Sequence, residues 1–352
     1  MKYLHIMNND KKFIPNYIKT IENNFKFQEH HFIIFSQNNN DYYKKHNNIY
    51  LIDKKKKYFN LEKKLYKAEK IILHSLFNRN VIMILFLQPW LLKKSKWVLW
   101  GADLYNYRRE KKKIKHKLLE FMRGKVIKNL EGVITYIKGD YELTQEWYNT
   151  KANYYESMMY LSNSPSYNID EKELKVKIKE HTFIQIGNSA DSRNNHIKIL
   201  DVINKFNNKY NRKIKIICPL SYGNEKYAKR VIDYGKSLFG KDFVPLTKFM
   251  DLKTYNKLQS NIDIAIFNHK RQQAMGNILT LLYLGKKVYI RDDITTWDFM
   301  KKIDIKVFSF NNYNNNLLEK IDPEVAKQNR EKIDSRFNID LFIEEWTNIF
   351  NS

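Results

Sequence analysis

Short apolar runs alternate with amphipathic stretches along the first half of the chain. The runs are rich in Ile, Val, Tyr and Phe, and they predict β-strands at residues 3–7, 31–35, 71–74, 97–100 and 133–136. Apolar positions at helical spacing predict helices between them, for example at 61–70 and 114–130. Strands that alternate with helices are typical of a mostly parallel, doubly wound sheet.

The same alternation starts again in the second half. Strands are predicted at 183–186, 214–218, 262–267 and 288–290, with helices at 196–205, 225–238 and 277–284. Residues 161–173 are rich in turn formers and predict a linker. We expect one Rossmann-like domain at 1–163, a linker at 164–176, a second Rossmann-like domain at 177–337, and a C-terminal helix at 338–352 whose packing partner the pattern does not reveal. Open α/β sheets bind ligands at the carboxyl ends of their strands, so we expect a cleft on which both sheets open.

The charge of the chain points to phosphate-bearing partners or an anionic membrane. Among 352 residues, 63 are Lys or Arg and 38 are Asp or Glu, which gives a net charge of +25. Lys and Asn recur throughout, however, as expected of an AT-rich genome. The charge is therefore either a binding footprint or background composition, and by itself it names no partner.

Cysteine content and hydropathy restrict the compartment. The single cysteine, Cys218, excludes an internal disulfide and a cysteine zinc cluster, and it fits a reducing compartment, with the cytoplasm as the default. The longest apolar run, 81–87, is stopped by Gln88 and Pro89, far short of the ~20 residues that span a bilayer. Residues 1–7 lead into a polar loop and predict a first strand rather than a signal peptide.

Polar loops follow three predicted strands of the second half, at 187–196, 219–224 and 268–277. Glycine permits close backbone approach, a helix N-terminus attracts phosphate, and Arg271 offers a multidentate donor. Taken singly, each loop is equally consistent with an ordinary strand-to-helix connection in which, for example, Asp191 caps the helix. Together they predict a nucleotide site, with donor-binding candidates Gly187, Asn188, Ser189, Asp191, Arg193, Pro219, Ser221, Tyr222, Arg271, Gln272, Gln273, Gly276 and Asn277.

Several common motifs are missing from the sequence. It contains no G-x-G-x-x-G, no Walker A loop, no D-x-D and no H-E-x-x-H. Their absence disfavours a dinucleotide enzyme, a P-loop ATPase and a metal-dependent mechanism. We therefore expect no cofactor and no metal ligand.

Two residues of the first half are candidates for acid–base chemistry. Asp103 lies in the segment W-G-A-D-L-Y (100–105), where apolar neighbours can tune a carboxylate that acts on a sugar hydroxyl. His74 ends another predicted strand. The alternatives are a helix cap for Asp103 and a semi-buried structural role for His74.

Residues 108–128 interleave cations with apolar residues. A basic amphipathic helix of this kind can lie on an anionic membrane, or it can pack on the core and leave its basic face in water. The acceptor or membrane candidates in and before this segment are Trp100, Tyr105, Arg108, Arg109 and Lys115.

These motifs together resemble one enzyme family. The segment W-G-A-D-L-Y, the loop 187–196, and Arg271-Gln272-Gln273 with Gly276 are similar to the bacterial TDP-N-acetylfucosamine:lipid II N-acetylfucosaminyltransferases, glycosyltransferase family 56. His74 and the nearby Phe77-Asn78 also match the family's histidine-bearing segment ahead of W-G-A-D-L-Y. The similarity runs from about residue 74 to 298 in the same order.

The resemblance implies a GT-B fold, with an acceptor-binding first domain and a donor-binding second domain. It also implies a TDP-activated deoxyamino sugar as donor and an undecaprenyl-diphosphate-linked saccharide as acceptor, at the cytoplasmic face of the inner membrane, in biosynthesis of enterobacterial common antigen or an O-antigen-like polysaccharide. Within this family the membrane interpretation of 108–128 is favoured. A transferase of another TDP- or UDP-sugar to a surface glycan remains as an alternative. A basic nucleic-acid-modifying GT-B enzyme and a non-catalytic sugar-nucleotide-binding protein remain as alternatives from other classes.

A mechanism follows as a hypothesis. The leaving diphosphate would be stabilised by the helix that starts near Gly276, by Arg271 and Arg193, and by backbone N–H groups of 187–189. Asp103, with His74 as the alternate, would orient or deprotonate the acceptor hydroxyl.

Overall fold

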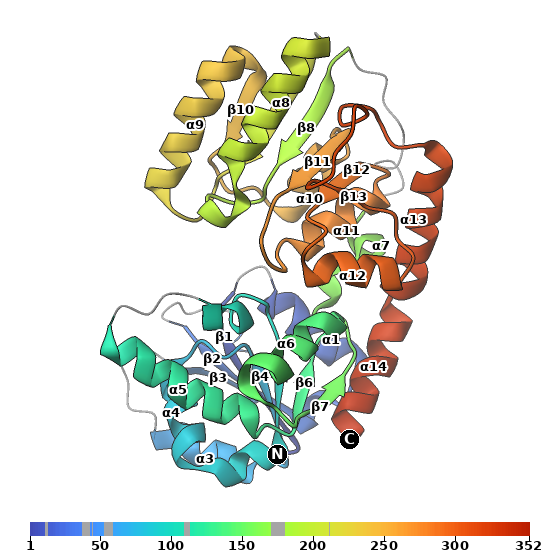
Figure 1. Cartoon of the computed structure of the whole chain (residues 1–352). Helices are drawn as coiled ribbons and strands as arrows, with labels where there is room; N and C mark the ends of the chain where they lie inside the picture. The colour runs from blue at the N-terminus through green and yellow to red at the C-terminus, as the bar shows by residue number, and fades with distance from the viewer. Residues whose placement is uncertain are drawn as a thin grey trace. The chain divides into compact units, whose positions relative to one another are not determined.

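The computed structural model describes residues 1–10, 13–36, 43, 45–52, 59–108, 113–169, 180–210 and 212–352. The chain forms two compact units (Figure 1). Unit 1 contains Met1–Ser162 together with Ile339–Ser352, and unit 2 contains Asn163–Asn338. Each unit is built on one parallel sheet.

Unit 1 holds a seven-stranded sheet in the order β3-β2-β1-β4-β5-β6-β7, and all neighbouring strands are parallel. This is the doubly wound Rossmann order extended by one strand. The strands are β1 (Tyr3–Asn8), β2 (His30–Phe35), β3 (Ile49–Ile52), β4 (Lys70–His74), β5 (Ser95–Val98), β6 (Gly132–Ile134) and β7 (Asn153–Tyr155). The helices are α1 (Ile14–Asn24), α3 (Phe59–Lys67), α4 (Arg79–Leu87), α5 (Ile114–Lys128), α6 (Lys138–Tyr148) and α14 (Ile339–Asn351), with short 3₁₀ helices η1 (Phe27–Glu29), η2 (Pro89–Lys94), η3 (Leu104–Arg108) and η4 (Leu161–Asn163).

The two faces of this sheet differ in chemistry because side chains alternate along each strand. One face is apolar, and its core contains Leu4, Ile33, Leu73 and Trp97. The other face carries buried histidines from neighbouring strands. Burial of both faces explains why these strands read as nearly continuous apolar runs.

The C-terminal helix α14 packs on the histidine-bearing face of unit 1. Its Trp346 indole donates to the carbonyl of Met158 at 3.1 Å, and the ring stacks 6.3 Å from His74. Phe350 lies 4.7 Å from the ring of His30. The C-terminal helix therefore covers one face of the first sheet. Periodicity alone did not reveal this packing partner.

Unit 2 holds a six-stranded parallel sheet in the order β10-β9-β8-β11-β12-β13. The strands are β8 (Thr182–Ile186), β9 (Ile214–Pro219), β10 (Phe243–Leu246), β11 (Ile264–Phe267), β12 (Lys287–Ile290) and β13 (Phe308–Ser309). The helices are α7 (Pro165–Asn168), α8 (His196–Tyr210), α9 (Glu225–Phe239), α10 (Leu252–Gln259), α11 (Met275–Tyr283), α12 (Thr295–Lys302) and α13 (Pro323–Arg336), with 3₁₀ helices η6 (Ser192–Asn194) and η7 (Gly240–Asp242).

The predicted doubly wound α/β architecture is confirmed. The strands that the pattern missed are β3, β7, β10 and β13, and every one of them lies at the edge of its sheet and has two to four residues. Such short strands are too brief to show a period. The expected linker 164–176 contains α7, which packs within unit 2 against α11 and α13, and its part from 170 onward lies outside the described residues.

Candidate functional site

Three loops at the carboxyl edge of the unit 2 sheet meet at one side chain, Asn188. Its Nδ2 donates to the Tyr222 hydroxyl at 2.9 Å, and its Oδ1 accepts from Gln273 Nε2 at 3.1 Å. The loops after β8, β9 and β11 are thereby connected. The grouping that the sequence predicted for these three loops is therefore present as direct contacts.

The loop after β8 needs a glycine at its start. Gly187 has a φ of +61°, and a Cβ there would lie 2.4 Å from His196 Nε2 and 2.7 Å from Asn194 Oδ1. Asn194 Oδ1 accepts from the Asn188 N–H at 3.0 Å and lies 2.7 Å from His269 Nε2. Burial lowers the pKa of His269 to about 3 and that of His196 to about 4, so both rings are neutral at pH 7.

The loop after β11 delivers a helix N-terminus to this edge. Ala274 adopts the left-handed conformation with a φ of +62°, and α11 starts at the next residue. The first-turn N–H groups of α11 lack intrahelical acceptors and attract an anion. The side chains of Arg271 and Gln272 just before it are buried, and Gln272 Oε1 has no hydrogen-bond partner among the described residues. Backbone strain and an unsatisfied polar atom of this kind are common at ligand sites.

Part of the expected phosphate cradle is engaged elsewhere, and this corrects the sequence hypothesis. The Gly187 N–H donates to the Ile266 carbonyl at 3.0 Å, and the Asn188 N–H is held by Asn194, so neither points to a ligand. The Arg193 guanidinium pairs with the Asp191 carboxylate at 2.6 Å. Burial works to raise the pKa of Asp191, but its hydrogen bonds from Arg193 outweigh this effect and lower it. The start of α11 therefore remains as the main anion-attracting feature, and the buried guanidinium of Arg271, whose Nη1 donates to the Gln272 carbonyl at 2.9 Å, places a positive charge a few residues before it.

Other predicted donor residues support the loops. A Cβ on Gly276 would lie 2.8 Å from Asn163 Oδ1, so glycine permits this close approach. Asn277 Oδ1 accepts from Gln259 Nε2, at the end of α10, at 3.1 Å. Pro219 is the last residue of β9 and pairs with Leu246 of β10. Among the remaining candidates, Ser189 is buried and Ser221 is half-buried.

Two exposed aromatic rings stand on adjacent loops of this edge. Tyr222 lies three residues beyond Pro219, and Phe249 lies three residues beyond Leu246, the two residues that pair between β9 and β10. Phe249 is 81% exposed and Tyr222 is 58% exposed. Sequence analysis missed Phe249 because it missed β10. Exposed rings at a nucleotide site provide stacking surfaces for a base.

In unit 1, Asp103 has no exposed surface and is held by four hydrogen bonds. Its Oδ2 accepts from the Leu76 N–H at 3.1 Å and the Trp97 indole at 2.8 Å, and its Oδ1 accepts from the N–H groups of Trp100 and Leu104 at 3.0 Å each. Burial raises its pKa against the opposing effect of these bonds. Asp103 therefore connects the loops after β4 and β5, and in this arrangement it does not reach a substrate.

His74 is also buried, inside a chain of hydrogen-bonding rings. Its Nδ1 lies 2.9 Å from the Tyr160 hydroxyl, and its Nε2 lies 3.2 Å from His5 Nδ1, while His5 Nε2 lies 3.0 Å from His30 Nδ1. One proton on each ring satisfies all three links. Burial lowers the pKa of His74 and of His30 to about 3. The Trp100 indole donates to the Tyr160 hydroxyl at 3.0 Å, so this series of hydrogen bonds begins at the W-G-A-D-L-Y segment.

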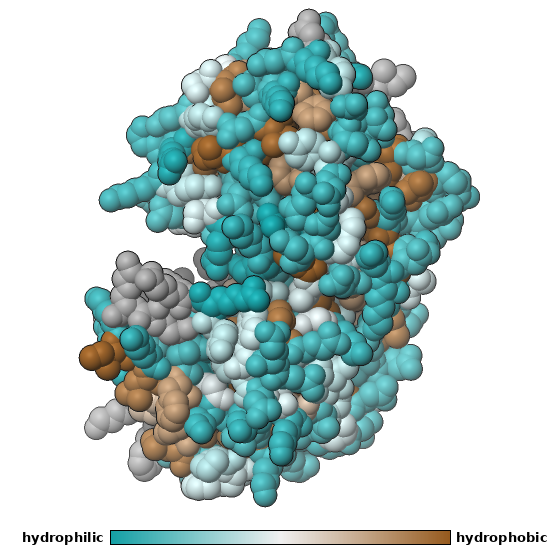
Figure 2. Space-filling view, viewed as in Figure 1, coloured by the Kyte–Doolittle hydropathy of each residue, from teal (hydrophilic) through white to brown (hydrophobic). Residues whose placement is uncertain are grey.

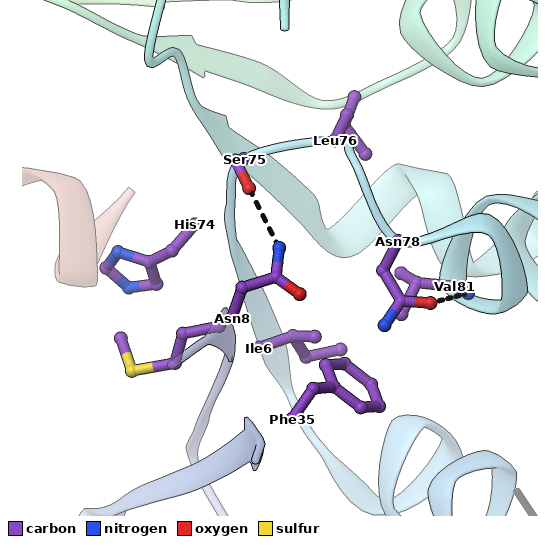
Figure 3. Close-up of a pocket in the computed structure, with 9 residues that line it drawn as sticks. Ile6, Asn8, Phe35, His74, Ser75, Leu76, Asn78 and Val81 are labelled. Carbon is purple, nitrogen blue, oxygen red and sulfur yellow. Dashed lines mark hydrogen bonds between the residues drawn. The ribbon is translucent and has the colours of Figure 1, made fainter. Parts of the chain in front are cut away.

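A small cavity of about 10 Å³ opens at the carboxyl edge of this sheet, beside the ends of β1 and β4 (Figure 3). Asn8 points to Ser75 and donates to its hydroxyl at 3.5 Å, while Asn78 turns toward the start of α4, where it accepts from the Val81 N–H at 3.2 Å. Ser75 has a φ of +83°, a strained backbone for a residue with a Cβ. The backbone strain and the polar side chains mark this edge as a candidate acceptor site.

Asp10 is a further carboxylate at the same edge that sequence analysis did not single out. It follows β1, is half-buried, and accepts from the Phe13 N–H at 3.2 Å at the start of α1. Burial raises the pKa of Tyr160, and the negative charge of Asp10 adds to this effect. Unlike Asp103, Asp10 reaches the surface.

The expected acceptor and membrane residues fall into different environments. Tyr105 is buried, and its hydroxyl donates to Asp140 at 3.1 Å, which corrects its expected role as a contact residue. Trp100 is half-buried, whereas Arg108 and Lys115 are exposed. Arg109 lies outside the described residues.

Among the described residues, no three His, Cys, Asp or Glu side chains lie where they could together hold a metal ion. In the same part of the chain, no helix has both the length and the apolar character to cross a membrane.

Comparison with known proteins identifies the family. Residues 7–352 match the family described as 4-alpha-L-fucosyltransferase, glycosyl transferase group 56. The chain belongs to this family. The resemblance that the motifs indicated is confirmed, and the protein is a hexosyltransferase-type glycosyltransferase.

Solved structures show the same fold at low sequence identity. Anabaena Alr3699/HepE in complex with UDP has a TM-score of 0.71 at 8% identity, with 100% of both chains covered. Sucrose-phosphate synthase from Thermosynechococcus elongatus has a TM-score of 0.67 at 11% identity, covering 100% of this chain and 98% of that one. A glycosyltransferase from Rickettsia africae has a TM-score of 0.65 at 13% identity, covering 99% and 98%. The predicted GT-B fold is confirmed.

Proposed function

We propose that this enzyme transfers a deoxyamino sugar of the N-acetylfucosamine type from a TDP-sugar to an undecaprenyl-diphosphate-linked saccharide. It would act at the cytoplasmic face of the bacterial inner membrane, as a peripheral enzyme of surface polysaccharide biosynthesis. Family membership supports the reaction class. The observation that carries the donor assignment is the cluster at the carboxyl edge of unit 2, where Asn188 connects three loops beside the start of α11.

The donor would bind to unit 2 through groups of complementary chemistry. The first turn of α11 and the Arg271 guanidinium would stabilise the diphosphate as negative charge develops on the leaving group. Gln272 Oε1, buried without a partner in the described part of the chain, would accept from a sugar hydroxyl or the base. Tyr222 and Phe249 would contact the base.

The acceptor would bind at the carboxyl edge of unit 1. We assign the base to Asp10, because it follows β1 at this edge and, unlike Asp103, reaches the surface, and we assign positioning roles to Asp103 and His74. Asp103 holds the loops that present Ser75 and Trp100. His74 supports Trp100 through Tyr160.

Calorimetric titration with TDP, UDP and GDP, each with magnesium and with EDTA, tests the donor site. Selective binding of TDP in both conditions supports the proposal, and incubation with TDP-sugars and a lipid-linked acceptor should then give product. Failure to bind any of the three nucleotides, or binding only with magnesium, would contradict it. Binding of TDP without turnover of any TDP-sugar would favour a non-catalytic protein, and salt-sensitive binding of DNA would favour a nucleic-acid enzyme.

The variant Asp10→Asn tests the base. Asparagine keeps an oxygen for the Phe13 N–H but cannot take a proton, so we expect turnover to fall by about 100-fold or more while TDP affinity is unchanged. Asp322→Asn is the matched control, because Asp322 also accepts backbone N–H groups at a helix start, in unit 2. Turnover of Asp10→Asn equal to that of the control would remove Asp10 from the mechanism.

A further inference from the structure

Helix α5 is apolar on two sides. Leu119, Met122, Val126 and Ile127 pack on the core of unit 1. A second stripe, Ile114, Leu118 and Phe121, follows the spacing of one helix face and points outward, with Ile114 84% and Phe121 55% exposed. A helix that only packed on the core with a basic face in water would have no second apolar stripe.

Helix α4 and the 3₁₀ helix η2 extend this surface. Met83, Phe86, Leu87 and Trp90 recur at helical spacing; Leu87 is 65% exposed, and Met83 and Trp90 are exposed as well. The rings of Phe86 and Phe121 are 6.2 Å apart and connect the stripes of α4 and α5. We call these seven residues the apolar face: Met83, Phe86, Leu87, Trp90, Ile114, Leu118 and Phe121. Figure 2 shows hydrophobic atoms gathered over the region of α4 and α5.

Positive charge borders the apolar face. Lys115, Lys117 and Lys125 are exposed on α5, and so is Lys113 directly before it. Glu120 is the one acidic residue between 113 and 128, and its carboxylate accepts from Arg123 at 2.7 Å and is thereby neutralised. The exposed charge of this helix is therefore uniformly positive, which complements an anionic surface.

A groove on the other flank of α5 adds a place for a polar headgroup. Its volume is about 310 Å³, and Lys125, Lys128 and Phe121 line it together with the rings of Tyr107 and Trp147. Glu120 also lines the groove, with its carboxylate paired to Arg123. These two rings stack 5.2 Å apart, and the Arg108 guanidinium lies 4.6 Å above Trp147. Phe121 belongs to both the groove and the apolar face, so the two features are contiguous.

We propose that the apolar face enters the interfacial region of an anionic phospholipid bilayer, while the groove takes lipid phosphate. Exposed apolar side chains at the acyl boundary are removed from water, and each lysine near anionic headgroups adds about 1 kcal/mol of attraction, roughly a fivefold gain in binding. This inference rests on the proposed function and extends it, because binding to the bilayer through the apolar face would bring the enzyme to a lipid-linked acceptor. Vesicle binding, however, needs neither donor nor acceptor.

Co-sedimentation of the whole protein with vesicles tests the proposal. We expect binding to vesicles that contain phosphatidylglycerol and weak binding to pure phosphatidylcholine. The double variant Leu118→Ser/Phe121→Ser should bind at least about tenfold more weakly. Lys125→Ala/Lys128→Ala removes two lysines and should bind about 25-fold more weakly, most clearly at low salt. Tyr210→Ser, which alters an exposed ring of unit 2, is the matched control and should bind as the wild type does.

Trp90 reports on insertion. Brominated lipids should quench its fluorescence, and Trp90→Phe should lose that quenching. Vesicle binding that is the same in the Leu118→Ser/Phe121→Ser variant as in the wild type would overturn the proposal. So would self-association of the wild type that the variant abolishes while neither binds vesicles, because the face would then join two copies. Vesicle binding without TDP binding would support this inference and contradict the proposed function. TDP binding without vesicle binding would contradict this inference and support the proposed donor site.

Discussion

The two units share a sheet topology but use their polar residues differently. In each, the first strand along the chain lies between the second and fourth strands of that unit. Unit 1 places its polar groups inside: His5, His30 and His74 lie across one face of the sheet, and Asp103 is enclosed by donors. Unit 2 places them at the carboxyl edge, around Asn188. One sheet topology therefore supports a buried polar interior in unit 1 and a polar carboxyl edge in unit 2.

This difference assigns different roles to residues that look alike in the sequence. Asp103 and Asp191 both follow a strand, yet only Asp103 is completely buried. Arg123 and Arg271 are both buried, but Arg123 donates to the carbonyl of Asp103 within unit 1, whereas Arg271 lies just before the start of α11. Altering unit 1 should therefore change folding, and altering the edge of unit 2 should change ligand affinity.

The largest expected effect is that of Asp103→Asn. Asparagine replaces one of the two carboxylate oxygens by an NH₂ group, which would face N–H donors that now bind that oxygen. Unit 1 should therefore lose about 3–5 kcal/mol of stability. Turnover should be lost, while calorimetry should show nearly unchanged TDP affinity because the donor cluster lies in unit 2. Denaturant unfolding followed by tryptophan fluorescence measures the change. Unfolding at the wild-type midpoint together with normal turnover would contradict the assigned role.

Acidification should destabilise unit 1 more than unit 2. The unfolded chain protonates its histidines near pH 6.5, but burial lowers the folded pKa of His30 and His74 to about 3 and that of His196 to about 4. Between these values the unfolded state binds more protons, so the free energy of unfolding falls as the pH falls, by about 1 kcal/mol per histidine and pH unit.

Hydrogen exchange at pH 6.5, 5.5 and 4.5 resolves the two units. The buried histidines of unit 1 are His5, His30 and His74, whereas those of unit 2 are His196 and His269, so protection should fall more steeply in unit 1. Asp103 acts in the opposite direction, because burial raises its pKa and its folded form takes up a proton more readily. A protection that rises in unit 1 on acidification would refute the histidine assignment.

Arg271→Ala should weaken TDP binding without unfolding the protein. Loss of a charge-assisted hydrogen bond to a diphosphate corresponds to about 10- to 100-fold in the dissociation constant. Arg193→Ala is the matched comparison, since the Arg193 guanidinium is held by Asp191, and we expect a change of less than about threefold. Equal losses in the two variants would mean that Arg193 leaves Asp191 to bind the ligand.

The smallest effect is expected for Phe249→Ala. A ring that stacks on a base contributes about 1–3 kcal/mol, so TDP affinity should fall by at least fivefold, and Phe249→Trp should restore it. Calorimetry measures both variants. If Phe249→Ala binds TDP as the wild type does, the ring lies outside the base site.

Much of the fold and part of the site could be predicted from the order of residues. Apolar periodicity is a local property, so the central strands and the restart of the αβ alternation after residue 180 were visible in the sequence. The motifs around Trp100, Gly187 and Arg271 indicated the family, and strand ends placed three loops at one edge. The short edge strands β3, β7, β10 and β13 were not visible, because they are held by one neighbour rather than by their own pattern.

The tertiary structure alone decided the role of each polar group. Whether Asp103 is a base or a buried hydrogen-bond acceptor depends on donors from Leu76 and Trp97, which come from two different strand regions. In the same way, the environment of His74 depends on Trp346 at the far end of the chain, and the exposure of Ile114 depends on which side of α5 meets the core. Secondary structure is encoded by neighbours in sequence, whereas burial and hydrogen-bond partners arise from residues that only folding brings together.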